Sequence, residues 1–201
     1  MGKPPEEWRN HSTKHPLGAT RLQPGDLKRL YRIINTKQFD YRDRFMPILA
    51  QQANETESQF EERKGRVHNA FVTSVTVNTT NGVMLTGNEE AFLDSENLPE
   101  NICSILFSTR STILPLGFTP TCSIVVFLDF TLPPPFDFNR LPTLATQNES
   151  NFEIFSDNEG WFTSSNASLN DFFNTRAKHA NWLHRGGTYD ALLFCISGNL
   201  I

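Results

Sequence analysis

Apolar side chains recur every three or four residues in the first third of the chain, and this spacing predicts two helices. The first helix starts after Pro24 and Gly25. Its apolar face comprises Leu27, Leu30, Tyr31 and Ile34. A second, longer helix is expected from about Tyr41 to Lys64, with Pro47 as a kink or late start and Gly65 placed to end it.

From Val67 onward, apolar and polar residues alternate with a period of two, which is typical of strands. One face of the first strand carries Phe71, Thr73, Val75 and Val77. Asn81-Gly82 is the strongest short signal for a β-hairpin, and Val83 and Leu85 belong to the return strand. A third strand is expected near Ile102 to Ser108.

The segment "CSIVVFLDF", which starts at Cys122, is apolar at almost every position. A strand that is apolar on both faces lies in the centre of a sheet, covered on each side. A short strand then follows from Phe152 to Phe155. The next segment predicts a helix with an apolar face of Phe162, Leu169, Phe172, Phe173 and Ala177. The closing "YDALLFCIS" predicts a buried strand or a short helix.

These elements predict an α+β fold: N-terminal helices packed on a mixed or antiparallel sheet of about five strands, with one further C-terminal helix. The 201 residues suit one domain, and seventeen Phe predict a Phe-rich core. We expect a single domain over residues 24–201, with a helical part at 24–65 and a sheet-rich part at 66–201. Residues 1–23 mix Pro, Gly, Ser, Thr and charge without a period, which predicts a flexible arm.

Three cysteines, Cys103, Cys122 and Cys195, lie far apart, each within an apolar run and without a C-x-x-C partner. This pattern is typical of buried, reduced thiols and favours a cytoplasmic protein. No stretch reaches the ~18 apolar residues that a membrane helix needs. Any membrane contact would therefore go through a segment absent from this chain.

Charge is distributed unevenly along the chain. Residues 1–66 carry a balance of +4 and residues 67–201 a balance of −8, within a net charge of −4. The simplest interpretation is that the two parts attract each other within one molecule or between copies. The more specific alternative is that the basic third forms a face that binds phosphate or anionic lipid. Nucleic acid is not the expected partner, because the positive balance is well below that of a typical nucleic-acid-binding domain.

The motifs that identify common enzyme classes do not occur, among them G-x-x-x-x-G-K-[ST], G-x-G-x-x-G, H-E-x-x-H and G-x-S-x-G. The five histidines have no paired cysteines, so a structural zinc site is not expected. The sequence therefore favours a protein without a metal or cofactor and disfavours an enzyme.

The richest polar constellation is "TRAKHANWLHRGGTYD", which starts at Thr175. It brings five potential cations together: Arg176, Lys178, His179, His184 and Arg185. They could form a basic helix end before a glycine loop, or they could bind a phosphate or an acidic partner. Alternatively, His184 could act as a general base oriented by Asp190 or Asp129. The structural interpretation is favoured, because histidine is near neutral by default.

Asp129 ends the apolar strand just before three prolines. A buried carboxylate is costly unless it is paired or hydrogen-bonded, so Asp129 needs donors. Backbone amides of the following turn, Arg140, Arg185 or His184 could supply them without any chemistry. A catalytic carboxylate at a strand end is the competing interpretation.

Four segments occur in the same order as similar segments of uncharacterised bacterial proteins: "LPENICSILF", "IVVFLDF", "ATQNESNFEIFSDNEGWF" and "NWLHRGGTYDALL". The chain resembles these proteins from Leu27 to Leu193, and the resemblance implies no assigned activity. Some of them continue past the YD-x-L-L stretch into membrane-spanning helices. The resemblance would make this chain the soluble domain of a longer protein, at the cytoplasmic face of a membrane.

The preferred hypothesis is a non-enzymatic binding or assembly module that contacts a protein partner or itself. Its polar surfaces would be the basic helix face and the later cluster: Lys28, Arg29, Arg32, Arg176, Lys178, His179 and Arg185. One alternative is a hydrolase or transferase acting on a phosphate-bearing substrate, with Asp129 and His184 as acid and base. Another is a weak binder of nucleic acid or anionic ligands.

Overall fold

A computed structural model of the chain describes residues 10–17, 22–117, 119–130 and 150–176. These residues form one antiparallel sheet of six strands, in the order β1-β6-β5-β4-β2-β3. The strands are β1 His11–Pro16, β2 Ser74–Thr79, β3 Met84–Gly87, β4 Ile102–Ser108, β5 Cys122–Asp129 and β6 Asn151–Ser156. The α-helices are α1 Pro24–Phe45, α2 Glu57–Ala70 and α3 Glu159–Asn174, and the 3-10 helices are η2 Met46–Ile48, η3 Glu90–Leu93 and η4 Leu114–Leu116.

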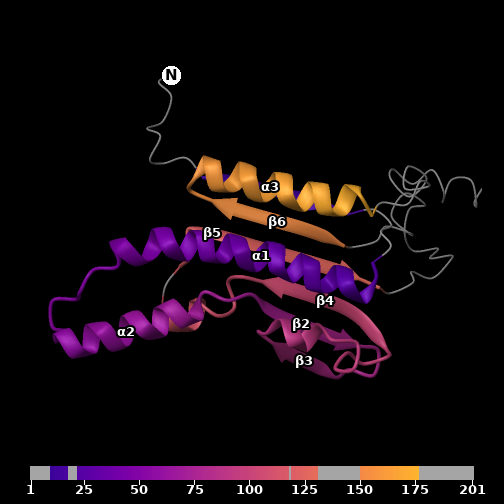
Figure 1. The fold of residues 1–201 in the computed structure, drawn as a ribbon, viewed down its shortest axis with the longest axis horizontal. Coiled ribbons are helices and arrows are strands. Elements are labelled where there is room, and N and C mark those ends of the chain that lie inside the picture. Colours follow the sequence, from indigo (N-terminus) through magenta and orange to yellow (C-terminus); the bar gives the residue numbers. More distant parts are fainter. Residues whose placement is uncertain (1–9, 18–21, 118, 131–149, 177–201) are drawn as a thin grey trace, which may run out of the picture.

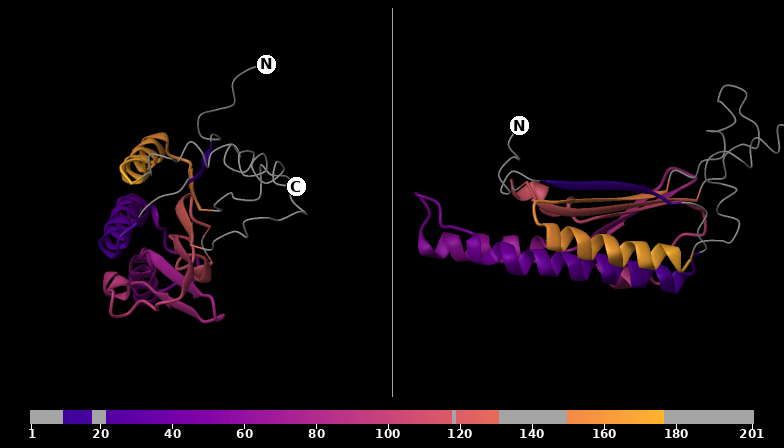
Figure 2. Two further views of the ribbon diagram at one scale, coloured as in Figure 1. Left: turned by 90° about the vertical axis from the view of Figure 1, so that its right-hand side faces the viewer. Right: turned by 90° about the horizontal axis from the view of Figure 1, so that it is seen from above.

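Helices α1 and α3 lie side by side on one face of the sheet, and the core fills the space between the two layers (Figures 1 and 2). Helix α1 contributes the fully buried Leu30 and Ile34, and β5 contributes Ile124 and Val126. These residues follow a period of three to four in the helix and of two in the strand, as burial on one face requires. The predicted α+β class is confirmed, and β5 lies in the middle of the sheet as expected. Its burial alternates from Ile124 onward, so equal cover on both faces, as predicted, is not seen among the described residues.

The predicted β-hairpin is also confirmed. Strands β2 and β3 pair antiparallel, and Gly82 in the turn between them has φ +82°. Glycine adopts this left-handed conformation without the steric cost that a Cβ atom brings. The Asn81-Gly82 pair therefore predicted the turn correctly, because the turn requires a residue that adopts a positive φ.

The helix boundaries in the first third differ from the prediction. The first helix does not end before Tyr41, where the second was expected to begin, but continues to Phe45, because its inner face continues through Tyr41 onto the aromatic ring of Phe71. Pro47 lies in η2, beyond the end of α1. The second helix starts only at Glu57, and Gly65 lies inside it rather than at its end.

The expectation of a flexible arm over residues 1–23 is wrong for His11–Pro16, which form edge strand β1 beside β6. The amide of Leu17 extends this pairing by donating to the Ser150 carbonyl at 2.8 Å. The segment was missed because backbone hydrogen bonds, rather than apolar side chains, hold it. Its rings still pack on the core side, where His15 lies 4.7 Å from Phe152 between ring centroids.

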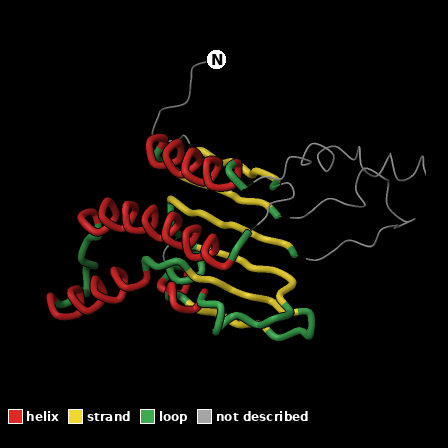
Figure 3. The backbone as a smooth tube through the Cα atoms, turned by 45° about the vertical axis from the view of Figure 1, so that its right-hand side comes forward, coloured by secondary structure: helices red, strands yellow, loops and turns green. Residues whose placement is uncertain are grey.

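The last turn of α1 and most of α2 extend beyond the end of the sheet (Figures 1, 2 and 3). Residues 42–66 form this extension, which we call the projecting hairpin. Residues 24–38 of α1 lie over the sheet, and we call them the clamped half.

Among the described residues, no helix has the length and apolarity needed to span a bilayer. The apolar "YDALLFCIS" segment lies outside the described residues.

Candidate functional site

An aromatic cluster fixes the base of the projecting hairpin to the core. The rings of Tyr41 and Phe45 both pack on Phe71, with centroids 5.4 and 5.5 Å apart. The Tyr41 hydroxyl also accepts a hydrogen bond from the Thr121 amide at 3.0 Å. Burial raises the pKa of Tyr41, so the phenol stays neutral and serves as a rigid anchor.

Beyond this base, the hairpin is closed by Glu55 and Arg63. The Arg63 guanidinium donates to both carboxylate oxygens of Glu55 at 2.7 Å and to the Ala50 carbonyl at 2.9 Å. Only 13% of the Arg63 side chain and 10% of the Glu55 side chain are exposed. These hydrogen bonds lower the pKa of Glu55 from 4.5 to about 2. The pair ties the loop to α2 across eight residues of chain.

The rest of α2 is stabilised by contacts within the hairpin itself. Thr56 and Gln59 form a reciprocal capping box at the start of the helix. The Phe60 ring lies under the Arg63 guanidinium at 5.3 Å and under the Lys64 ammonium at 5.7 Å. Val67 is the single buried residue of α2. Most of this helix therefore packs on no other described element.

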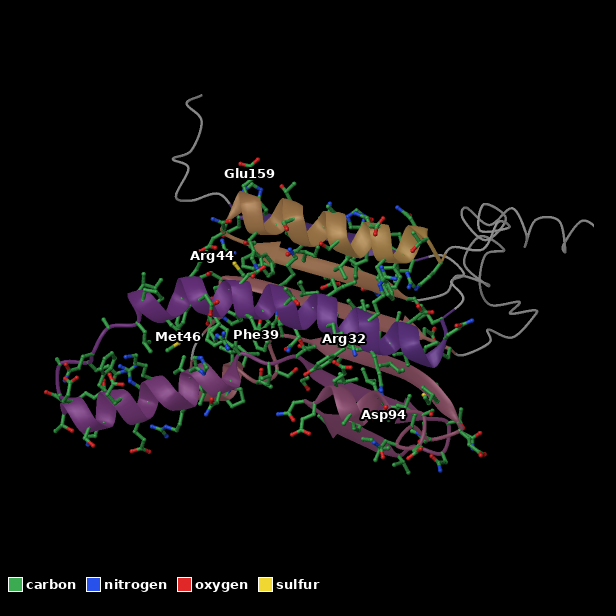
Figure 4. All side chains as sticks on the ribbon, viewed as in Figure 1. Arg32, Phe39, Arg44, Met46, Asp94 and Glu159 are labelled. Atoms are coloured by element: carbon green, nitrogen blue, oxygen red, sulfur yellow. The ribbon has the colours of Figure 1, made fainter. Side chains whose placement is uncertain are left out.

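Apolar side chains are exposed on and beside the hairpin. Ile48 is 75% exposed, and Phe39 is 36% exposed beneath the Arg42 guanidinium at 4.6 Å. Figure 4 shows Phe39, on α1, and Met46, at the start of η2, on the side toward α2. Isolated exposed apolar residues are common on protein surfaces, but Ile48 lies in η2, within the part of the chain that projects beyond the sheet.

A polar hollow of about 550 Å³ lies between the loop and α2. Its lining consists of Gln52, Ala53, Asn54, Glu55, Gln59, Glu62, Arg63 and Arg66. Glu55 and Arg63 are already paired with each other, whereas Glu62 and Arg66 are largely exposed and only 4.0 Å apart. The hollow can therefore accept polar groups and charged groups of either sign.

The predicted basic helix face is largely neutralised within the molecule. Lys28 forms an ion pair with Asp94, and Arg32 donates to both carboxylate oxygens of Glu90, at 2.5 and 2.9 Å. Figure 4 shows Arg32 on the clamped half and Asp94 toward the β2–β3 side of the sheet. Arg29 lies exposed on the same helix. The basic first third thus attracts the acidic remainder within one molecule, as the simplest interpretation of the charge pattern predicted.

Arg176 has a structural place at the end of α3. It donates to Asp26 at 2.7 Å and to the Phe172 carbonyl at 2.9 Å, and its guanidinium lies 4.0 Å from the Phe172 ring centroid. Burial pushes the pKa of Asp26 upward, but hydrogen bonds from Arg176 and the Gln23 amide outweigh this effect and the pKa is lowered. The contact joins the start of α1 to the end of α3.

The other residues of the predicted cluster lie outside the described residues: Lys178, His179, His184, Arg185 and Asp190. Asp129 is the last residue of β5, at the end of the strand that lies away from the hairpin, and its amide donates to the Ser150 hydroxyl at 2.8 Å. Its side chain points away from α1, because Leu128 faces the core. The structure therefore does not bring Asp129 together with the described sites above.

The described cysteines are free, and Cys122 is buried at the start of β5. Burial raises the pKa of the Cys122 thiol to about 11, with the Asp157 carboxylate adding to the effect. Such a thiol is a poor nucleophile. Within the described part of the chain, no three His, Cys, Asp or Glu side chains are grouped as metal ligands would be.

Sequence reasoning missed the loop and the ion pair of the hairpin. It placed residues 49–56 inside a helix, so it could not identify the loop that Glu55 closes. One signal was available, because Thr56 followed three residues later by Gln59 is a capping-box pattern that marks a helix start. Comparison with protein-family models, with curated proteins and with solved structures finds no match to this chain.

Proposed function

We propose that the protein is a non-enzymatic binding or assembly module that contacts a protein partner or another copy of itself through the projecting hairpin. The observation that carries this proposal is a preformed element with little packing against the other described residues. Helix α2 buries only Val67, while Ile48, in the 3-10 turn η2 that follows α1, is 75% exposed. A short helix usually depends on packing of one face for its stability, so an unpacked helix favours an external contact.

The hairpin is a better candidate surface than the basic helix face. Lys28 and Arg32 are engaged by Asp94 and Glu90, and a partner would have to displace those ion pairs. The hairpin needs no such rearrangement, because the Glu55–Arg63 pair already holds its loop in place. Preorganisation of this kind reduces the entropy lost on binding.

We place this contact in the cytoplasm. The buried, unpaired thiol of Cys122 supports this assignment, because a reduced cysteine used as a small core residue suits a reducing compartment.

Site-specific photo-crosslinking tests the proposal. A benzophenone amino acid replaces Ile48 in the full chain, and the matched control carries it at Glu159, which is exposed on α3 away from the hairpin (Figure 4). We expect illumination in cells to give a protein adduct of defined mass at position 48 and none at position 159. Absence of an adduct at position 48, or equal adducts at both positions, would contradict the proposal.

A further inference from the structure

Helix α2 carries a row of exposed polar residues with a distinctive order. Gln59, Glu62, Arg66 and Asn69 follow one another at intervals of three or four and are all exposed. This spacing puts them on one face of the helix. The order along the row is amide, carboxylate, guanidinium, amide. The charged pair Glu62 and Arg66 therefore has one neutral amide side chain on each side, Gln59 before it and Asn69 after it.

That row is complementary to itself when a second helix runs antiparallel. An axis at the level of Lys64 brings Glu62 of one copy opposite Arg66 of the other, and the reverse contact forms at the same time. The amides of Gln59 and Asn69 also meet across this axis. A parallel arrangement instead sets like charges opposite each other, which is unfavourable. The charge order therefore selects the antiparallel arrangement.

Gly65 is a second, independent feature of the same face. It lies in the interior of α2, where glycine lowers helix stability relative to alanine. Its backbone conformation is helical rather than left-handed, and a Cβ atom built on it would meet nothing within 4 Å. Within the part of the chain that the structure describes, neither turn geometry nor close packing explains the glycine. Glycine at this position does allow the backbone of a second helix to approach closely.

We propose that the projecting hairpin binds a second copy of this chain, with the two α2 helices antiparallel about a twofold axis near Lys64. This inference rests on the proposed function, since it names the partner of the same surface. Each Glu62 pairs with Arg66 of the other copy, and each Gly65 lies near the crossing point of the helices. The hollow beside Gln52 and Asn54 receives side chains of the other copy.

Sedimentation of the full-length protein over a concentration series tests the contact through charge reversal. Wild type is expected to form dimers, and Glu62→Arg and Arg66→Glu are each expected to weaken dimerisation at least tenfold. Mixing the two single variants restores association as a heterodimer, because both cross-pairs become attractive again. The double variant Glu62→Arg/Arg66→Glu restores the homodimer for the same reason.

Lys64→Glu is the matched control. It makes the same change of charge as Arg66→Glu but lies on the opposite side of α2, where Lys64 pairs with Glu61 at 3.0 Å. We expect dimerisation of this variant to stay within twofold of wild type. Equal weakening by Lys64→Glu and Arg66→Glu would show a general charge effect and overturn the antiparallel contact.

Gly65→Ala separates association from folding. Alanine favours the helix, so the thermal midpoint of the variant should rise or stay unchanged, while dimerisation weakens because a methyl group enters the crossing point. Stronger or unchanged dimerisation would overturn the close approach at Gly65.

The inference and the proposed function can fail separately. A wild-type protein that stays monomeric at all concentrations, or reversed variants that do not recover on mixing, overturns the self-association. If the crosslinker at position 48 still captures a different protein, the binding function stands with another partner. If it captures nothing, binding through Ile48 fails, while the sedimentation series still decides the self-association.

Discussion

The two ends of helix α1 have very different surroundings. In the clamped half, Leu27, Leu30, Tyr31, Ile34 and Gln38 are all buried, and ion pairs hold Lys28 and Arg32 to the η3 segment. None of residues 42–66 in the projecting hairpin that follows belongs to the buried core, and α2 buries only Val67. Helix α1 is thus part of the core in its first half, and within about two turns its end becomes part of a surface element.

This difference shows how the molecule divides its stabilising interactions. The clamped half is held by long-range contacts, such as the hydrogen bond from the Trp161 indole to the Lys37 carbonyl at 3.0 Å. The hairpin is held by short-range contacts, such as those between Glu55 and Arg63. Local contacts can be lost without unfolding the whole domain, so the two regions should respond differently to substitution.

Leu30→Ala in the clamped half should have the largest effect on stability. Leu30 is fully buried, and its truncation removes apolar contacts and leaves a cavity, which costs about 3 kcal/mol of unfolding free energy. Ile48→Ala, on the hairpin, is the matched truncation of an exposed side chain and should change the unfolding free energy by less than about 0.5 kcal/mol. Urea denaturation followed by circular dichroism measures both. Comparable losses in the two variants would mean that the hairpin is part of the cooperative core.

Arg176→Met should have an intermediate effect. It removes charged hydrogen bonds to Asp26 while keeping an apolar side chain over Phe172, and the expected loss is about 2 kcal/mol at pH 7. Because the pKa of Asp26 is lowered in the folded protein, this stabilisation is present above its ordinary pKa of 3.8 and is lost as the pH falls through the folded value. The difference between wild type and variant should therefore shrink when denaturation is repeated near pH 3. A difference that does not change with pH would assign the effect to packing alone.

Arg63→Met should affect the hairpin and leave the core unchanged. Amide hydrogen exchange is expected to speed up in α2 near Gln59 and to stay constant near Leu30, because the variant loses contacts within the hairpin only.

Acid should reproduce the effect of Arg63→Met on the wild-type protein. The pKa of Glu55 is about 2 in the folded protein and 4.5 ordinarily, so its contribution is full above about pH 4.5 and is lost as the pH falls toward 2. An NMR titration of the Glu55 carboxyl checks the pKa directly. A midpoint near 4.5 would show that the Arg63 contact is absent in solution.

The elements that sequence reasoning predicted well are those with a strong local signal. The apolar run from Cys122 predicted strand β5, Asn81-Gly82 demanded a particular turn, and α3 carries an apolar face that packs on β6. Each of these properties is determined within about ten residues of chain. The α+β class followed from them, because strands and helices with one apolar face must cover each other.

The features that sequence reasoning missed depend on contacts between distant residues. Strand β1 forms because its backbone pairs with the edge of β6, about 140 residues later in the chain. The segment His11–Pro16 is polar, so it has no alternation of apolar residues from which a strand could be predicted. The partner of Arg176 is Asp26, 150 residues away. Lys28 and Arg32 looked like a free basic face because their partners Asp94 and Glu90 are separated from them by about 60 residues. A charge pattern shows that partners exist, but only the fold assigns them.

Cysteine alkylation sharpens the boundary between the two regions and should have the smallest effect. Cys122 is buried, and burial raises its pKa to about 11, so iodoacetamide should leave it unmodified in the native protein while the partly exposed Cys103 reacts. Cys122 lies next to Thr121, which binds the Tyr41 anchor at the base of the hairpin. If the hairpin frays independently of the core, Arg63→Met leaves the labelling rate of Cys122 unchanged, as measured by mass spectrometry of its peptide. Faster labelling of Cys122 in this variant would show that opening of the hairpin spreads through Tyr41 into the sheet, and the two regions would then form one cooperative unit.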